Sequence, residues 1–113
     1  MRTQRYVQIG AALLLLTLPH CSKFSDPCEA EKDCEGGNDA DVDACVQNAQ
    51  GAEDIASAYD CRDQFDEYID CVKENSSCKD VSGRKSYNSG DTCKALETAY
   101  QTCQAAASGR GKQ

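Results

Sequence analysis

Residues 61–71 read CRDQFDEYIDC, with nine residues between the two cysteines. The same interval recurs in residues 93–103, CKALETAYQTC. Ten residues of α-helix rise about 15 Å, so two antiparallel helices with matched intervals bring both pairs of cysteines opposite each other. The repeated spacing therefore predicts two disulfides between two helices, Cys61–Cys103 and Cys71–Cys93.

The apolar residues inside each interval share a helix face with the cysteines. Phe65 and Tyr68 follow Cys61 at helical steps, and Leu96 and Tyr100 follow Cys93 in the same way. Antiparallel packing would set Phe65 against Tyr100 and Tyr68 against Leu96. Two apolar stripes of this kind predict an antiparallel helical hairpin linked by a disulfide at each end.

This paired spacing, with aromatic residues inside it, resembles that of the twin Cys-x9-Cys, or coiled-coil-helix-coiled-coil-helix, proteins. The resemblance covers residues 61–103 and implies an antiparallel helical hairpin. Two features depart from that family. The connecting segment 72–92 is long and contains Cys78, and the N-terminus resembles an export signal, whereas that family resides in mitochondria. We therefore interpret the resemblance as one of architecture.

The N-terminus has the features of an export signal. Arg2 and Arg5 precede an apolar run over residues 6–18, whose centre reads AALLLLTL. A run this short cannot cross a hydrocarbon layer of about 30 Å as a helix. A basic start, a short apolar run and an abrupt change to polar residues are typical of a signal peptide, which we predict over residues 1–20.

The end of this segment resembles the lipobox of bacterial lipoproteins. Residues 18–21 read Leu-Pro-His-Cys, although His20 stands where a small residue is expected. The resemblance implies that Cys21 receives a diacylglycerol and becomes the new N-terminus. Removing Cys21 from the nine cysteines leaves eight, which is enough for four disulfides. As a whole, the chain resembles small cysteine-rich bacterial lipoproteins of unassigned function; the alternative is a secreted protein.

The composition of residues 21–113 predicts that disulfides are needed for folding. They contain nine Leu, Ile, Val or Phe residues, and nineteen acidic against ten basic residues, a net charge of −9. So few large apolar residues with so much charge normally indicate disorder. Each disulfide typically contributes about 2–4 kcal/mol. Dense cysteine in a small exported domain also indicates an oxidising compartment.

The sequence predicts an all-α fold: a small disulfide-stapled helical bundle built on the antiparallel hairpin. No segment alternates as a strand does, and the polar segment 75–90 is expected to be a loop. Asp26 is the expected N-cap and Pro27 the first residue of the first helix. The expected helices cover residues 27–35, 39–50, 52–75 and 91–107. The expected regions are a tether at 21–27, a disulfide-rich domain at 28–107 and a flexible tail at 108–113.

Four cysteines remain outside the repeated interval: Cys28, Cys34, Cys45 and Cys78. They allow three sets of pairings. If Gly36-Gly37-Asn38 turns a helical hairpin, Cys28 and Cys45 lie at similar distances from the turn and can pair. Cys34 would then pair with Cys78.

The sequence carries few groups suited to catalysis. The only histidine, His20, lies in the signal segment, so a histidine-based nucleophile is excluded after export. No two cysteines are close enough for a redox dithiol or a zinc knuckle. Asp39, Asp41 and Asp43 suggest a calcium loop, but the required Gly and Glu are absent, and acids in a first helical turn are explained by the helix dipole. We expect no enzyme, and assign no catalytic, cofactor-binding or metal-binding residue.

Charge is distributed unevenly along the chain. Residues 26–74 carry sixteen acids and three bases, whereas residues 75–113 carry three acids and six bases. We interpret the acids as a solvated face, with a docking surface for a basic partner as the alternative. The negative sign disfavours nucleic acid as a partner.

These features together predict a non-enzymatic module of the bacterial cell envelope. It would be held to the membrane by lipid on Cys21 and would act as a structural element or by contact with an unidentified protein. The alternative is a secreted carrier of a small ligand or a metal.

Overall fold

The computed structural model describes residues 22–110. The expected signal peptide at residues 1–20, the lipidation residue Cys21 and residues 111–113 of the expected tail lie outside this range. The elements follow in the order α1 (Ser25–Glu35), α2 (Asp39–Ala58), α3 (Arg62–Asn75), β1 (Ser77–Val81), β2 (Arg84–Asn88) and α4 (Lys94–Arg110).

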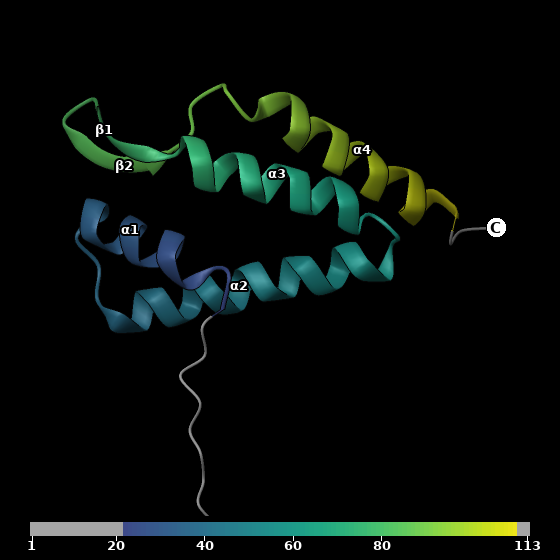
Figure 1. Ribbon diagram of the computed structural model, residues 1–113, viewed down its shortest axis with the longest axis horizontal. Coiled ribbons are helices and arrows are strands. Elements are labelled where there is room, and N and C mark those ends of the chain that lie inside the picture. Colours follow the sequence, from purple (N-terminus) through teal and green to yellow (C-terminus); the bar gives the residue numbers. More distant parts are fainter. Residues whose placement is uncertain (1–21, 111–113) are drawn as a thin grey trace, which may run out of the picture.

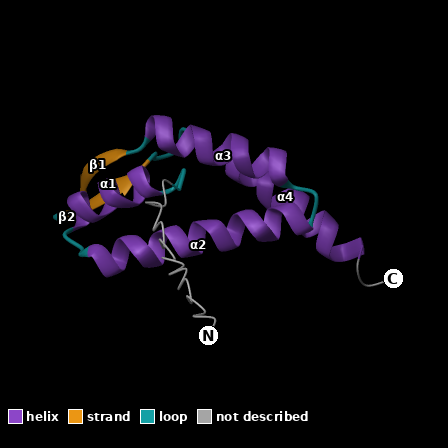
Figure 2. Cartoon of the chain, turned by 60° about the horizontal axis from the view of Figure 1, so that its bottom comes forward, coloured by secondary structure: helices purple, strands orange, loops and turns teal. Residues whose placement is uncertain are grey.

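The four helices form two pairs, with the β-hairpin beside one of them. α1 packs on α2, α3 packs on α4, and α2 contacts α3. The β-hairpin lies at one end of the molecule, where β2 contacts α1 (Figures 1 and 2). The fold is therefore mostly helical, but it is not the all-α fold that the sequence predicts.

The β-hairpin occupies the segment expected to be a loop. β1 and β2 pair antiparallel with Cys78 opposite Tyr87, and Ser82 and Gly83 form the turn with φ of 55° and 81°. Left-handed conformations at both turn positions match the twist of a two-residue hairpin. The prediction was wrong because both strands are polar, so no alternating pattern marks them. Their position depends on tertiary contacts with α1.

α1 begins earlier than predicted. Phe24, not Asp26, is its N-cap residue, and Asp26 lies in the first turn, where its charge suits the helix dipole. The helix ends at Gly36, whose φ of 84° lets its N–H reach the carbonyl of Lys32 at 2.8 Å. The cause of the early start is the burial of Phe24, which is 3 % exposed.

The break between α2 and α3 also differs from the prediction. α2 continues through Gly51, where it was expected to end, and stops at Ala58. The chain then turns at Asp60, which has a φ of 57°, and the N–H of Cys61 bonds to the carbonyl of Ala56 at 2.8 Å. This turn buries Cys61 completely and aims α3 back toward α4. Packing of Cys61, and not the local preference of glycine, decides where the helix ends.

α4 is shifted toward the C-terminus relative to its prediction. It begins at Lys94 instead of at residue 91, and it continues to Arg110, into the segment expected to be a flexible tail. The carbonyl of Asp91 accepts a hydrogen bond from the N–H of Lys94 at 3.2 Å. The turn before α4 buries Cys93, which is 1 % exposed and linked to α3.

A small core lies where α1, α2, α3 and α4 meet. Its buried members include Phe24, Ala56 and Phe65, and Tyr100 packs against them. The rings of Phe65 and Tyr100 meet edge to face, with centroids 5.4 Å apart, which is the contact predicted from the sequence. Tyr68 stacks on the same Tyr100 ring. The buried residues of the described chain are therefore two phenylalanines, three disulfide-bonded cysteines and one alanine.

Candidate functional site

The junction between the expected anchor and the fold is formed by residues 22–24. The N–H of Phe24 bonds to Oγ of Ser22 at 3.2 Å, and the Ser22 carbonyl accepts from the N–H of Ser25 at 3.0 Å. The Phe24 ring lies against Phe65, with centroids 6.3 Å apart. Residues predicted to be a polar tether are therefore part of the folded domain.

Lys23 connects this junction to two helices. Its Nζ lies 2.7 Å from Oε1 of Glu53 on α2 and 3.0 Å from Oδ1 of Asp66 on α3. Arg62 pairs with the same two carboxylates, with Nε 3.1 Å from Oδ2 of Asp66. Nζ of Lys23 also lies 5.1 Å from the centroid of the Phe24 ring. We call Lys23, Glu53, Arg62 and Asp66 the ion-pair cluster.

The ion-pair cluster shifts the titration of its members. Desolvation acts to raise the pKa of Asp66, but hydrogen bonds from Lys23 and Arg62 outweigh it and lower that pKa below its usual value. The same contacts with Glu53 and Asp66 raise the pKa of Lys23 against the opposing effect of desolvation. Both groups are partly exposed, so solvent screens their attraction. The cluster is better suited to orienting the junction than to proton transfer.

The eight cysteines from Cys28 onward form four disulfides, in the pairs that the sequence predicts. Cys28–Cys45 links α1 to α2, and Cys34–Cys78 links α1 to β1. The repeated interval forms Cys61–Cys103 and Cys71–Cys93 between α3 and α4. The Cα–Cα distances of the last two pairs are 5.9 Å and 5.8 Å, so the two ends of the helical hairpin are equally close.

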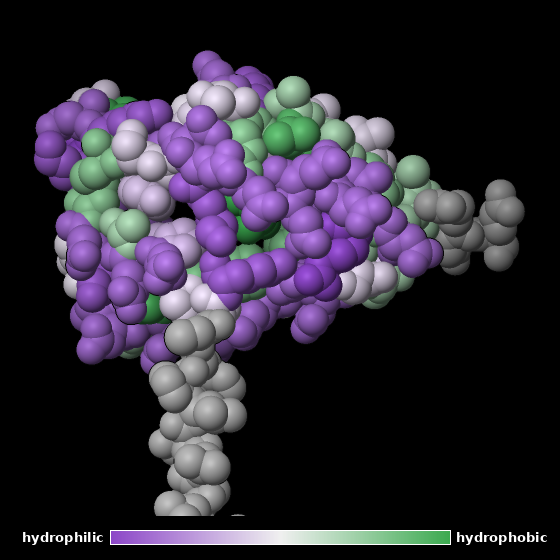
Figure 3. Space-filling model, in the orientation of Figure 1, coloured by the Kyte–Doolittle hydropathy of each residue, from purple (hydrophilic) through white to green (hydrophobic). Residues whose placement is uncertain are grey.

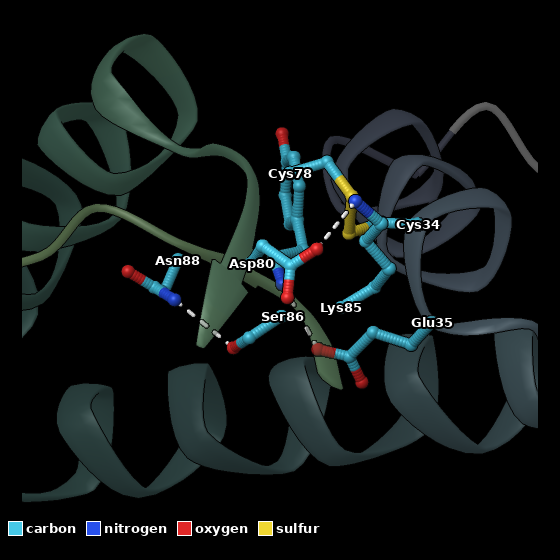
Figure 4. The surroundings of a disulfide bond; sticks show 8 residues. Cys34, Glu35, Cys78, Asp80, Lys85, Ser86 and Asn88 are labelled. Carbon is cyan, nitrogen blue, oxygen red and sulfur yellow. Dashed lines mark hydrogen bonds and ion pairs between the residues drawn. A yellow bond between two sulfur atoms is a disulfide. The ribbon is translucent and has the colours of Figure 1, made fainter. Parts of the chain in front are cut away.

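One disulfide, Cys34–Cys78, connects the first helix pair, α1 and α2, to the part of the chain that follows α3. Cys28–Cys45 lies within the first pair of helices, and two other disulfides lie within the second pair, whereas Cys34–Cys78 joins α1 to the hairpin that follows α3. Around this bond, Nζ of Lys85 lies 3.0 Å from Oδ2 of Asp80 (Figure 4). The N–H of Tyr87 donates to Oε1 of Glu35 at 3.0 Å, which is a second link between α1 and the hairpin.

The acids considered as a calcium loop begin α2 instead. Oδ1 of Asn38 accepts from the N–H of Ala40 at 2.8 Å, and Oδ2 of Asp41 accepts from the N–H of Asn38 at 2.8 Å. This is a capping box, which satisfies the free donors at the start of a helix. Within residues 22–110 no group of three His, Cys, Asp or Glu side chains is arranged to hold a metal ion.

Sequence reasoning missed the ion-pair cluster. Arg62 and Asp66 stand four apart, a spacing that signals a helical ion pair. Phe24 is the only large apolar residue in the predicted tether, which could have indicated that it is buried. No local sequence pattern shows that Lys23 reaches Glu53, because these two residues come together only when α1 packs on α2.

The described residues define a small cysteine-rich helical domain with four disulfides, which indicates an extracellular or otherwise oxidising compartment. Among residues 22–110, none of the helices combines the length and the apolar character needed to cross a bilayer. The chain matches no family of known proteins, no curated protein and no solved structure.

Proposed function

We propose that this chain is a non-enzymatic, lipid-anchored protein of the bacterial cell envelope that acts through contact with other proteins. The lipobox-like residues 18–21 and the disulfide-rich domain both support export to such a compartment. An envelope protein of this kind needs a rigid surface, and four disulfides provide one without a large apolar core.

The observation that carries the proposal is the short distance between Cys21 and the folded domain. Phe24, three residues after Cys21, is already buried against Phe65. An extended chain covers at most about 3.6 Å per residue, so this link reaches about 11 Å. Lipid on Cys21 would therefore hold the domain directly at the membrane surface and limit its reorientation.

A membrane-held domain of this charge favours a basic protein partner. Residues 26–74 carry sixteen acids and three bases, and these residues form α1, α2 and α3. A negative surface attracts a positive one over about a Debye length, close to 8 Å at physiological ionic strength. Association should therefore weaken as salt is added, and nucleic acid is disfavoured as a partner.

The anchoring part is tested by Cys21→Ser in a bacterial host, with Ser22→Ala as the matched control. We expect the native protein to pellet with membranes and to have the mass of residues 21–113 plus acyl chains. Cys21→Ser should be released into the soluble fraction, and Ser22→Ala should behave as the native protein does. A native mature protein without acyl mass rules the anchor out.

The alternative function, a secreted metal carrier, has a separate test. Calorimetry of the oxidised protein with Ca²⁺ and with Zn²⁺ should show no binding tighter than about micromolar, a free energy of about −8 kcal/mol. A tight one-to-one isotherm for either ion would favour the carrier. This result does not depend on whether Cys21 carries lipid, so the two tests can fail independently.

A further inference from the structure

A groove of about 290 Å³ lies between the two halves of the molecule. α1, α2, α3 and the end of β2 all contribute to its wall. Figure 3 shows the surface hollowed between α1 and α3. The lining residues that carry the argument are Pro27, Glu31, Tyr68, Val72, Ser76 and Tyr87.

Covalent links hold the walls of the groove in place. Cys28–Cys45 joins α1 to α2, and Cys45 is itself part of the wall. Cys34–Cys78 joins α1 to the β-hairpin that carries Tyr87. A groove between cross-linked elements is formed before a ligand arrives, which is the usual state of small-molecule sites.

Two tyrosines line the groove. Tyr68 is half-buried and stacks on Tyr100, with centroids 6.4 Å apart and planes at 14°, which fixes its orientation. Tyr87 is half-buried, and Glu35 holds its backbone N–H at 3.0 Å. Ring faces attract cations as well as apolar groups.

The groove also contains the carboxylate of Glu31, which is exposed and pairs with no cation of the described residues. Oε2 of Glu31 lies 3.6 Å from Sγ of Cys45, but a disulfide sulfur has no hydrogen to donate. No ion pair or other hydrogen bond reaches Glu31 from residues 22–110. Partial desolvation by the groove wall and the neighbouring charge of Glu35 raise the pKa of Glu31, although its side chain is exposed. A cation placed here would stabilise the charged form of the carboxyl.

We propose that this groove binds a small organic ammonium compound. Glu31 pairs with the positive charge, and Tyr68 and Tyr87 contact its alkyl substituents. An anion would meet the charges of Glu31 and Glu35. A purely apolar molecule would offer no positive charge to the Glu31 carboxylate.

The test is a titration of the oxidised protein with choline, followed by amide chemical shifts. The control ligand is 3,3-dimethylbutan-1-ol, which has the same shape without the charge. We expect saturable shifts at Ser76 and Tyr87 with choline, and affinity for the neutral analogue at least about tenfold lower. The groove does not include Cys21, so the result is independent of the lipid anchor.

Two variants on α1 separate a built site from general attraction to an acidic surface. Glu31→Gln removes the charge in the groove, whereas Glu29→Gln removes an equal charge that lies outside it. We expect Glu31→Gln to weaken choline binding at least about tenfold and Glu29→Gln to weaken it less than about twofold. Equal effects of the two variants, equal binding of the neutral analogue, or no saturable shift up to about 20 mM choline would each overturn the proposal.

Discussion

The ring of Phe24 packs edge to face against the ring of Phe65, with centroids 6.3 Å apart and planes at 67°. Phe24 lies at the N-terminal edge of the described chain, and Phe65 lies in the middle of α3. Their contact joins the residues next to the expected anchor to the disulfide-linked hairpin. The exposures of the two side chains, 3 % and 2 %, place both of them in the core.

Phe24→Ala should destabilise the domain by about 3 kcal/mol, because it removes a buried ring and leaves a cavity against Phe65. Urea denaturation at neutral pH measures the loss. Ile55→Ala is the matched control, since Ile55 is 50 % exposed and its truncation should change stability by less than about 0.5 kcal/mol. A Phe24→Ala protein as stable as the native one would show that residues 22–24 are a free tether.

Stability should fall in acid because of Asp66. Its pKa is lowered in the folded protein, since hydrogen bonds from Lys23 and Arg62 outweigh desolvation. A carboxyl with a lowered folded pKa stabilises the fold above its unfolded pKa of about 3.9, and this contribution is lost as pH falls through the folded value. Asp66→Asn should therefore reduce stability at neutral pH and flatten its decline below about pH 4.

The control for this pH dependence is Glu67→Gln on the same helix. Glu67 is exposed and makes no ion pair within the described residues. Its substitution should leave the shape of the pH profile unchanged. Equal flattening by the two variants would mean that net charge, and not the ion-pair cluster, sets the acid sensitivity.

Replacing Cys61 and Cys103 together by Ser should remove most of the helical circular dichroism at about 37 °C. The bond spans 42 residues of sequence, and the chain-entropy model assigns about 4 kcal/mol to a loop of this length. Cys61 is fully buried, and Cys103 is half-buried. Peptide mapping without reduction checks the pairing directly, and a fragment joining Cys61 to Cys71 would contradict it.

Limited reduction should open Cys34–Cys78 before the other disulfides. Cys78 is exposed, whereas Cys61 and Cys93 are 0 % and 1 % exposed, and a thiolate must reach a sulfur to attack it. Differential alkylation followed by mass spectrometry measures the order. Helical circular dichroism should persist at this stage because α3 and α4 keep both of their links. Early alkylation of Cys61 would contradict the burial order.

Gly51→Ala should stabilise the protein by about 0.5–1 kcal/mol, because alanine favours helix and glycine does not. The position lies within α2, and an added Cβ meets nothing within 4 Å. Gly83→Ala provides the contrast, since Gly83 turns the β-hairpin at a φ of 81° and alanine is strained there. Thermal unfolding should move in opposite directions for the two variants.

The polar hairpin shows the limit of local patterns. Ser82-Gly83 carries a turn signal, yet β1 and β2 have no alternation of apolar and polar residues, so a loop was predicted. At Gly51 the sequence predicts the end of a helix, because glycine often ends helices, but the structure places Gly51 inside α2. In both places contacts between distant segments outweigh small local preferences of about 1 kcal/mol.

The sequence by itself determined the largely helical character of this protein and the two disulfides of the repeated interval. Two matched ten-residue intervals leave one antiparallel arrangement that joins Cys61 to Cys103 and Cys71 to Cys93, because helix rise is constant. Tertiary structure alone decided the positions of Lys23 and Phe24, the β-hairpin and the groove beside Glu31. Each of these depends on how α1 packs on the rest of the chain, and such packing arises from many weak contacts that no local pattern encodes.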